Sequence, residues 1–434
     1  MQLFYHKNQC AMQPPMGWNS WDCYAATVTE KQLLEHAEYM SKNLLAFGWE
    51  YIVCDIQWYE PLAGTGGGEY RPFADLCMDE YSRLLPAENR FPSSAGGKGF
   101  APIAEKIHGM GLKFGLHYMR GIPRQAVHSK TAIKGTDATA EKIANPFSIC
   151  KWNSDMYGVD STNPRAKNYY NSLFEQFAGW GVDYVKVDDI CNTNMYPHSP
   201  YSGEGEIELM HSAISGCGRP MVLSLSPGPA LIEKSWHLSR YANMWRITDD
   251  FWDNWDSLKD MFKRCQLWQA HVKPGCWPDC DMLPLGRIGA GFKKPRLTNF
   301  TRDEQRTLMT LWCIFRSPLM MGGILPEADE WTLSLLTNAE VLSVQKFGAN
   351  PQQIIFNEKE AIWKNDAPDG KINLALFNLS DKKRKVICPL SELNFQKAAV
   401  FNLWNKSDAG TVTEEITAEV PPHGAALYRI TDLL

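Results

Sequence analysis

A repeated local pattern constrains the fold of this chain more than any other feature. Three times, an amphipathic helical segment is followed by a glycine and then by a short β-rich run that ends in polar residues. The glycine-and-strand segments are 47–55, 110–117 and 180–188. Glycine commonly ends a helix in the left-handed conformation, and an apolar run after it is typical of a buried parallel strand. The three segments are therefore predicted to be repeated αβ units.

Further candidate strands extend this pattern over about the first 340 residues. They are 16–21, 221–225, 243–247, 275–277 and 318–321. Together with the three repeats they make about eight strands that alternate with helices. That alternation favours a (β/α)8 barrel, the TIM-barrel fold of the α/β class, over a doubly wound sheet.

The pattern changes near residue 345, where helical periodicity ends and polar turns separate short strand-like runs. The runs are 354–356, 361–363, 372–377, 385–388, 398–404 and 425–430, and turn-forming residues fill 366–370, 380–381 and 405–408. Such a pattern is typical of antiparallel sheets. We therefore expect a catalytic barrel over residues 1–344 and a C-terminal antiparallel β-sandwich domain over residues 345–434.

Charge and composition narrow the class of partner. The net charge is only −5 over 434 residues and no block of like charges occurs, so neither nucleic acid nor a membrane is expected as a partner. A neutral small-molecule substrate fits better. No apolar stretch is long enough to cross a membrane and no export signal precedes the first strand, which predicts a soluble, cytoplasmic protein.

The 12 cysteines are scattered and form no CxxC pair. We expect them to be reduced, small apolar residues of the core. Cys276 and Cys280 lie near each other, but no neighbouring histidine or second cysteine pair completes a zinc pattern, so no metal site is expected.

Aspartates end several of the predicted strands. They are Asp55, Asp188, Asp250 and Asp281. In a barrel the carboxyl ends of the strands form the active-site face. A single aspartate there can simply cap the next helix, but four in register, with Lys186 and Arg246 beside two of them, indicate a catalytic site.

Lys186 and Asp188 lie two residues apart on one predicted strand, so both side chains point into the barrel mouth. A neighbouring cation keeps a carboxylate ionised. An ionised carboxylate is the nucleophile that a retaining glycosidase uses to attack an anomeric carbon. Asp189 points the other way, and we expect it to be structural.

A retaining glycosidase also needs an acid/base carboxyl about 5 Å from the nucleophile. Asp249 and Asp250 both end a predicted strand, and the segment 251–255 that follows them is rich in aromatic residues able to line a sugar site. Spacing alone leaves the choice between these two aspartates open.

Five segments of the chain together resemble glycoside hydrolase family 27 of clan D, the α-galactosidase and α-N-acetylgalactosaminidase family. They are 15–21, 181–188, 245–246, 277–283 and 317–321. The resemblance implies a retaining exo-α-glycosidase that hydrolyses terminal α-linked galactose-type residues of oligosaccharides or glycosides by double displacement. It also implies a (β/α)8 barrel followed by an antiparallel β domain, with no metal or organic cofactor.

The resemblance also implies roles for individual residues. The family's nucleophile stands two residues after the lysine and its acid/base four residues after the arginine, which gives Asp188 and Asp250 rather than Asp249. The substrate-binding residues by the same comparison are Trp21 beneath the sugar, Asp55 and Lys186 at its hydroxyls, Arg246 near O2, and Asp281 in the pocket.

The chain departs from the family pattern in places that affect specificity. Galactose-binding members carry two adjacent aspartates after the second strand, whereas this chain has Asp55 and Ile56. A tyrosine expected at the end of the third strand is His117, which is either a sugar contact or a structural histidine. Small residues after the fifth strand, Ser226 and Gly228, resemble the pattern that accepts a 2-acetamido group, so Ser226 is expected to contact the sugar.

An insertion at 120–155 is longer than the family's usual loop and could shape a leaving-group site or a distinct sugar preference. An alternative is therefore a sister activity on the same scaffold, such as that of an isomalto-dextranase-like or β-L-arabinopyranosidase-like enzyme. A non-catalytic sugar-binding protein is a further alternative, but the presence of both Asp188 and Asp250 argues against it.

Overall fold

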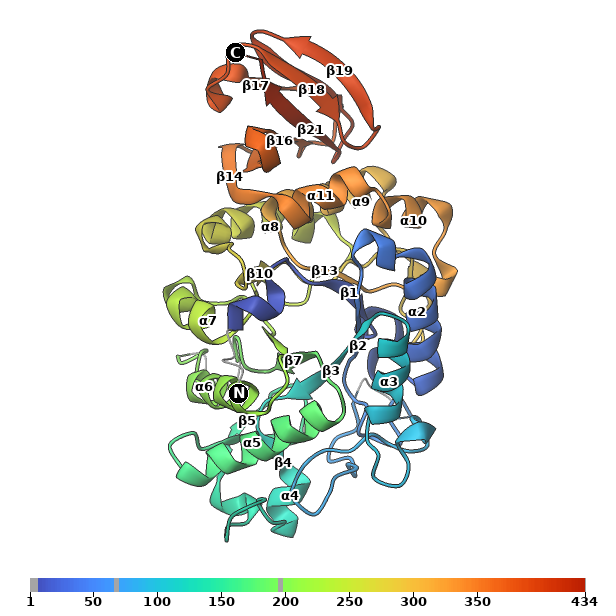
Figure 1. The fold of residues 1–434 in the computed structure, drawn as a ribbon, viewed down its shortest axis with the longest axis vertical. Coiled ribbons are helices and arrows are strands. Elements are labelled where there is room, and N and C mark those ends of the chain that lie inside the picture. Colours follow the sequence, from blue (N-terminus) through green and yellow to red (C-terminus); the bar gives the residue numbers. More distant parts are fainter. Residues whose placement is uncertain (1–6, 66–69, 194–197, 434) are drawn as a thin grey trace.

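Eight parallel strands form the central sheet of the computed structural model, which describes residues 7–65, 70–193 and 198–433 (Figure 1). Their order is β10-β9-β8-β7-β3-β2-β1-β13. The bounds are β1 Met16–Asn19, β2 Tyr51–Cys54, β3 Lys113–Met119, β7 Tyr184–Asp188, β8 Val222–Leu225, β9 Met244–Arg246, β10 Trp277–Asp279 and β13 Leu319–Met321. A parallel bridge between Leu283 and Met321 joins the segment after β10 to β13 and closes the circle. The predicted (β/α)8 barrel is confirmed.

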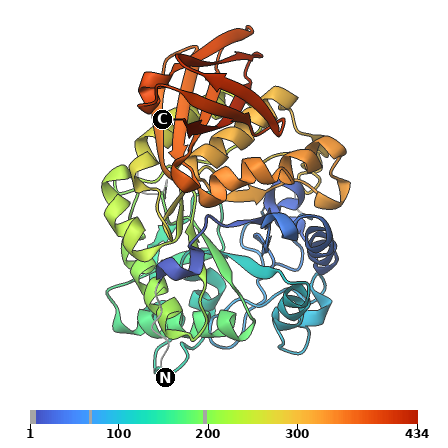
Figure 2. The ribbon, with the colours of Figure 1, turned by 45° about the horizontal axis from the view of Figure 1, so that its top comes forward.

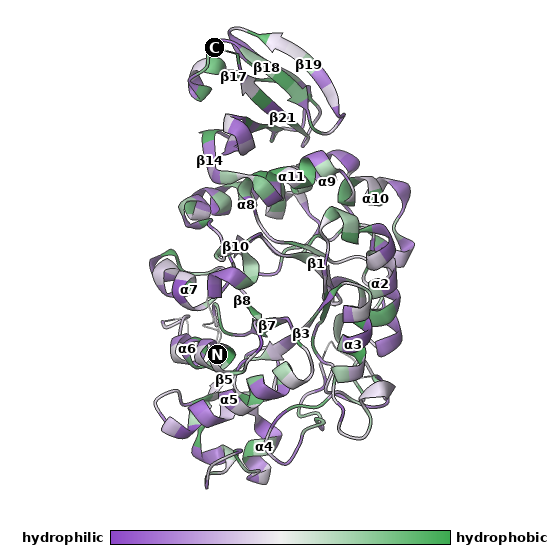
Figure 3. Ribbon diagram, viewed as in Figure 1, coloured by the Kyte–Doolittle hydropathy of each residue, from purple (hydrophilic) through white to green (hydrophobic). Residues whose placement is uncertain are grey.

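Helices surround the strands, and many carry both hydrophilic and hydrophobic residues (Figure 3). They are α1 Trp21–Tyr24, α2 Glu30–Asn43, α3 Ala101–Gly109, α5 Pro164–Gly179, α6 Glu204–Gly216, α7 Ser235–Tyr241, α8 Trp255–Trp268, α9 Arg302–Phe315, α10 Glu330–Leu336 and α11 Ala339–Phe347. Gly48, Gly111 and Gly181, which precede β2, β3 and β7, have φ values of 99°, 80° and 81°. Glycine tolerates this left-handed conformation without a steric penalty, so the predicted helix-ending glycines are confirmed.

The insertion between β3 and α5 forms a small substructure of its own. It contains β4 Ile122–Pro123, α4 Arg124–Ser129, β5 Ala144–Ile149 and β6 Met156–Val159, and its three strands pair in the order β4-β6-β5. In Figure 1 it lies at the end of the molecule opposite to the C-terminal strands.

Antiparallel strands make up the C-terminal part. They are β14 Ala349–Phe356, β15 Glu360–Asp366, β16 Ile372–Asn378, β17 Arg384–Pro389, β18 Ala398–Asn402, β19 Ser407–Val412, β20 Glu415–Val420 and β21 Ala425–Asp432. Six of them form one sheet, β14-β15-β16-β21-β18-β19, and β17 pairs with β20. The predicted β-sandwich is confirmed. The helix α11 runs on to Phe347, beyond the proposed domain boundary at residue 344.

Strands β19 and β20 were not predicted. Residues 405–408 were interpreted as a turn, but β19 begins at Ser407. Five of its six residues are exposed, so the strand shows no hydrophobic alternation. In β20 buried residues alternate with residues that are exposed or half-buried. This period of two is typical of a strand, and the sequence prediction did not use it.

The C-terminal sheet packs on helices of the barrel, among them α8 and α9 (Figure 2). Phe315 of α9 meets Trp363 of β15 with ring centroids 6.1 Å apart, and Phe262 of α8 meets Phe377 of β16 at 4.9 Å. These aromatic residues are all buried, so the two parts share a continuous apolar core. Across the described ranges, no helix is both long and apolar enough to cross a membrane.

Candidate active site

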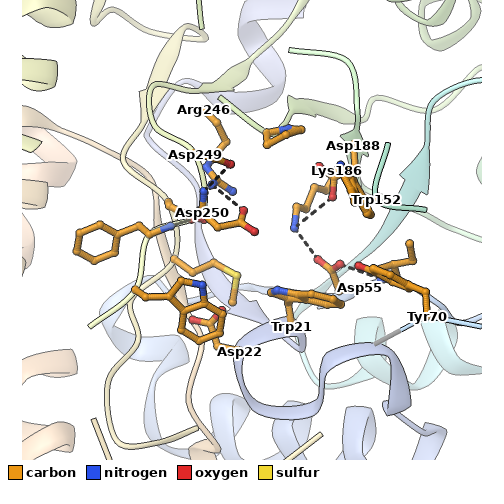
Figure 4. Close-up of a pocket in the computed structure, with 16 residues that line it drawn as sticks. Trp21, Asp22, Asp55, Tyr70, Trp152, Lys186, Asp188, Arg246, Asp249 and Asp250 are labelled. Atoms are coloured by element: carbon orange, nitrogen blue, oxygen red, sulfur yellow. Dashed lines mark hydrogen bonds and ion pairs between the residues drawn. The ribbon is translucent and has the colours of Figure 1, made fainter. Parts of the chain in front are cut away.

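A pocket of about 330 Å³ opens at the carboxyl ends of the barrel strands (Figure 4). Its lining residues are Trp21, Asp22, Asp55, Ile56, Tyr70, Trp152, Lys186, Asp188, Pro227, Arg246, Asp249, Asp250, Phe251, Trp252, Asp281 and Met282. Asp55 follows β2, Asp188 ends β7 and Arg246 ends β9. Functional side chains of a barrel are expected at this end of the strands.

Asp188 is held by three neighbours. Its Oδ2 accepts a hydrogen bond from His117 Nε2 at 3.0 Å and lies 4.0 Å from Lys186 Nζ, and its Oδ1 accepts one from Ser226 Oγ at 2.7 Å. Burial by itself would raise the pKa of Asp188, but Lys186 and the two hydrogen bonds lower it below its ordinary value. Asp188 is therefore a fixed, ionised carboxylate.

Lys186 also forms an ion pair with a second carboxylate, that of Asp55. Its Nζ donates to Asp55 Oδ2 at 2.9 Å, and the same oxygen accepts from Asn19 Nδ2 at 2.7 Å. The other oxygen of Asp55 accepts from the backbone N–H of Ile56 at 2.8 Å. Burial opposes a charged lysine, but Asp55 and Asp188 together raise the pKa of Lys186 above its ordinary value. The cation is thus permanent and its position is fixed.

Arg246 joins two carboxylates on the other side of the pocket. Its Nη2 lies 3.1 Å from Asp250 Oδ1 and 2.7 Å from Asp281 Oδ2. The Asp250 side chain is 60% exposed, whereas that of Asp281 is buried and also accepts from the backbone N–H of Phe251 at 2.8 Å. Burial raises the pKa of Asp281 to about 7, with Asp250 adding to the rise and Arg246 opposing it.

Asp249 also lines the pocket, but its carboxylate has a different partner. Its Oδ1 accepts a hydrogen bond from the backbone N–H of Asp250 at 2.9 Å. Arg246 therefore orients Asp250, while Asp249 bonds to the neighbouring backbone. This geometry favours Asp250 for a role that requires a carboxyl aimed into the pocket.

A chain of five aromatic rings borders the pocket, from the insertion to the segment after β9. Trp152 meets Tyr70 with centroids 5.6 Å apart, and Tyr70 stacks on Trp21 at 5.9 Å with an angle of 14°. Trp21 then meets Phe292 edge-on at 5.5 Å, and Phe292 meets Trp252 at 5.7 Å. Aromatic faces of this kind pack against the C–H faces of sugars.

The sequence predicts that Ser226 contacts the sugar and that His117 either contacts it or is structural. The structure places both residues beside Asp188. Both are buried, neither lines the pocket, and each donates to the Asp188 carboxylate. An added Cβ at Gly228 would lie 2.3 Å from the backbone oxygen of Thr248 and 2.4 Å from that of Arg246. The small residues after β8 therefore pack against Asp188 and against the backbone of Arg246 and Thr248.

The insertion reaches the pocket through Trp152 and is fastened nearby by Asp155. Asp155 Oδ2 accepts from Gln57 Nε2 at 2.6 Å and from Tyr59 Oη at 2.9 Å. We call these two hydrogen bonds the Asp155 clasp. Because Gln57 follows Ile56, the Asp155 clasp joins the insertion to the segment that supplies Ile56 to the pocket.

Asp189 lies outside the pocket. Its Oδ2 pairs with Arg120 Nη2 at 2.8 Å, and Arg120 Nη1 pairs with Glu206 at 3.0 Å. All three side chains are buried. This arrangement is a structural ion-pair network at the base of the insertion.

Several pocket residues were missed by sequence reasoning. Tyr70 lies far along the chain from the strand that precedes it, and no sequence pattern marks it. Asp22 stands next to Trp21 in the first motif, and that position was its only signal. Trp252, by contrast, lies in the aromatic segment after Asp250 that the sequence predicts to line a sugar site.

No disulfide bond joins any of the cysteines in the described residues. In the ranges that the structure covers, no group of three or more histidine, cysteine, aspartate or glutamate side chains is arranged to hold a metal ion.

Comparison with known proteins identifies the family. A family model described as alpha galactosidase A matches residues 161–346, and one described as the alpha galactosidase C-terminal beta sandwich domain matches residues 358–430. An α-galactosidase of Cyamopsis tetragonoloba is 26% identical over 437 residues, covering 99% of this chain and 89% of the relative.

Two solved structures are more similar in sequence. A family 27 β-L-arabinopyranosidase from Geobacillus stearothermophilus is 52% identical, with a TM-score of 0.95 and coverage of 99% of this chain and 98% of the other. A candidate α-N-acetylgalactosaminidase from Bacillus halodurans is 49% identical, with a TM-score of 0.87 and coverage of 96% and 97%. Together with the barrel, the C-terminal sandwich and the paired carboxylates, these similarities show that the chain belongs to glycoside hydrolase family 27 and is a retaining glycosidase.

Proposed function

We propose that the protein is an exo-glycosidase that hydrolyses terminal β-L-arabinopyranosides. β-L-Arabinopyranose has the ring configuration of α-D-galactopyranose but lacks the hydroxymethyl group at C5. The observation that carries the proposal is Ile56, which lines the pocket next to Asp55, where galactose-binding members of the family carry a second aspartate. The similarity to the arabinopyranosidase from Geobacillus stearothermophilus supports it.

The physical reason lies in the cost of an unpaired hydroxyl. The Ile56 side chain cannot accept a hydrogen bond, so a hydroxymethyl group placed against it loses its bonds to water without replacement. An unpaired buried polar group costs about 1–3 kcal/mol. A sugar that lacks the group avoids this cost, so the apolar wall favours the arabinoside over the galactoside.

α-Galactosides are the second candidate substrate. Sequence reasoning favoured galactose-type sugars, and the arabinoside was the alternative. The ion pair of Asp55 with Lys186 suits hydroxyls that both sugars share, so we expect α-galactosides to be hydrolysed as well. Because of Ile56, their hydrolysis should be weaker than that of β-L-arabinopyranosides. The case for α-N-acetylgalactosaminides is weaker, because Ser226 and Gly228 do not face the pocket.

In the proposed mechanism Asp188 is the nucleophile and Asp250 the acid/base. A carboxylate oxygen of Asp188 attacks the anomeric carbon while Asp250 protonates the departing glycosidic oxygen, which gives a glycosyl ester and a free alcohol. Asp250 then removes a proton from water, the water oxygen attacks the anomeric carbon, and Asp188 leaves as a carboxylate. Two inversions retain the anomeric configuration.

The remaining residues bind and position. Trp21 packs beneath the sugar, Asp55 and Lys186 bind its hydroxyls, and Arg246 and Asp281 fix the acid/base side of the pocket. His117 and Ser226 act as positioning residues, since both hydrogen-bond the nucleophile and neither lines the pocket.

A panel of nitrophenyl glycosides tests the proposal. We expect kcat/KM for the β-L-arabinopyranoside to exceed that for the α-D-galactopyranoside by about tenfold or more, which is the size of one lost hydrogen bond. The variant Ile56→Asp should shift this ratio toward the galactoside, and Ile56→Val is the matched apolar control. A galactoside preference in the wild type, or an unchanged ratio in Ile56→Asp, contradicts the proposal.

The α-D-fucopyranoside distinguishes the effect of an unpaired hydroxyl from the effect of the substituent's volume, because it carries a methyl group where galactose carries a hydroxymethyl group. If Ile56 acts through the unpaired hydroxyl, the fucoside should be hydrolysed nearly as well as the arabinoside. A fucoside as poor as the galactoside would mean that Ile56 excludes any substituent by its volume.

A further inference from the structure

Asp22 is a carboxyl group in the catalytic pocket that neither the mechanism nor the sugar-binding residues explain. It follows Trp21 in α1, lines the pocket and is only 3% exposed. Figure 4 shows it on the same side of the pocket as Trp21. Its Oδ2 is buried, and no hydrogen-bond partner for this atom occurs among residues 7–65, 70–193 and 198–433.

The surrounding backbone is built to leave room for this side chain. Gly322 follows β13, and a Cβ added there would lie 2.1 Å from Asp22 Oδ2. The backbone oxygen of Asp22 accepts a hydrogen bond from Gly289 N–H at 2.8 Å, which fixes the residue in place. A larger residue at position 322 would displace the carboxyl, so the two positions fit each other.

The charge state of Asp22 restricts what it can bind. Burial raises its pKa well above the ordinary value, and the nearby Asp281 raises it further, while Lys186 opposes the rise. Burial therefore favours the protonated, uncharged form of the Asp22 carboxyl group. Such a group donates one hydrogen bond and accepts others, which suits a hydroxyl group better than a cation.

A buried polar group without a hydrogen-bond partner costs free energy. That cost falls on the sugar-free protein and disappears if a ligand supplies the missing partner. We propose that Asp22 binds a hydroxyl group of the pyranose ring, one other than those held by Asp55 and Lys186. This proposal adds a residue to the sugar site of the proposed function. It rests on that function only in assuming that the ligand of the pocket is a pyranoside.

Deoxy sugars test this contact directly. The inhibition constants of L-arabinose and its monodeoxy analogues are measured against wild type and Asp22→Ala. In the wild type, removal of the hydroxyl that Asp22 binds should weaken binding by about 10- to 100-fold. In Asp22→Ala that one analogue should bind as well as L-arabinose, while the other deoxy analogues keep their penalties. Equal penalties in both proteins for every analogue overturn the proposal.

Two controls separate binding from folding. Asp369→Asn is the matched substitution, because Asp369 is exposed in the C-terminal part and has a left-handed φ of 61°, which asparagine tolerates. Asp22→Asn keeps a donor and an acceptor and should recover part of the affinity lost in Asp22→Ala. No recovery, together with a lowered unfolding temperature in both variants, would assign Asp22 a purely structural role and overturn the proposal.

The test of Asp22 does not depend on whether the protein prefers L-arabinose or D-galactose. If the protein binds D-galactose better than L-arabinose, the proposed function fails, and the same experiment is run with monodeoxy galactoses. The loss of one penalty in Asp22→Ala would then still support the hydroxyl contact.

Discussion

The two carboxylates that face each other across the pocket have opposite environments. The Asp188 side chain is 13% exposed and is fixed by His117, Ser226 and the nearby Lys186, whereas the Asp250 side chain is 60% exposed and is held by Arg246. A nucleophile must stay ionised, but an acid/base must exchange protons with its surroundings twice in each cycle. The difference teaches that exposure and hydrogen-bond number, rather than residue type, divide these roles between two aspartates.

The two cationic side chains that line the pocket, Lys186 and Arg246, also differ in their carboxylate partners. Lys186 forms a short ion pair with Asp55 and lies farther from Asp188, so it stabilises the charge of the proposed nucleophile without forming a short ion pair with it. Arg246 is shared between Asp250 and the buried Asp281. The pKa of Asp188 is therefore lowered by its neighbours, whereas burial raises the pKa of Asp281 on the other side of the pocket.

The largest expected effect comes from Asp188→Asn, which removes the nucleophile. An amide cannot form the glycosyl ester, so we expect kcat to fall by about 10⁴-fold or more with the fold intact. The measurement is turnover of the preferred nitrophenyl glycoside, with unfolding temperature as the control. A mechanism-based 2-fluoro glycoside should label the peptide that holds Asp188 in the wild type, and a label on another peptide would contradict the assignment.

Asp250→Asn should have a smaller effect that depends on the leaving group. Loss of the proton donor should reduce kcat/KM by about 10²- to 10⁴-fold for alkyl or sugar leaving groups, and much less for activated aryl groups. Asp249→Asn is the matched control, because Asp249 bonds to the backbone of Asp250. Equal losses on good and poor leaving groups in Asp250→Asn would favour Asp249 as the acid/base.

Asp281→Asn should change how stability depends on pH. The pKa of Asp281 is raised from an ordinary 3.8 to about 7, so between these values the folded protein holds a proton that the unfolded chain has released. The free energy of unfolding therefore falls as the pH rises through this window. In Asp281→Asn the fall should be smaller by about 4 kcal/mol, since the pKa is raised by roughly three units and each unit corresponds to about 1.4 kcal/mol.

Denaturant unfolding at several pH values between 4 and 8 gives this slope. Asp369→Asn, in the C-terminal part, serves as the control. A constant offset between wild type and Asp281→Asn at every pH would show that Asp281 does not titrate in the window.

The smallest expected effect comes from Ser226→Ala. Loss of the 2.7 Å hydrogen bond to Asp188 should lower kcat by about tenfold and leave KM nearly unchanged, because Ser226 does not line the pocket. Ser226→Glu should disable the nucleophile instead of tuning the preference for acetamido sugars. A changed ratio of kcat/KM for the two sugars in Ser226→Ala would return Ser226 to the sugar site.

The barrel was predictable from sequence because its signals are local. The glycine before each of β2, β3 and β7 and the buried run after it lie within a few residues of each other. The alternation of side chains also placed Lys186 and Asp188 at the barrel mouth. Strand β19 lacked such a signal, because its exposed polar residues pair through the backbone alone.

The remaining site residues depend on contacts between distant segments. His117 pairs in register with Lys186 on the adjacent strand, so its ring meets Asp188 instead of a sugar. No spacing in the sequence reports that approach. Tyr70 reaches the pocket by stacking on Trp21, and Asp22 depends on the space beside Gly322, so both required the folded chain.

The Asp155 clasp has a consequence for how this enzyme could evolve or be redesigned. It joins the insertion, which brings Trp152 to the pocket, to the segment that supplies Ile56. Two loops that come from different barrel units therefore depend on each other for these hydrogen bonds. Grafting the Ile56 segment alone onto a relative without the insertion would leave Gln57 and Tyr59 without this carboxylate, so a transplant of sugar preference should succeed only when both loops move together.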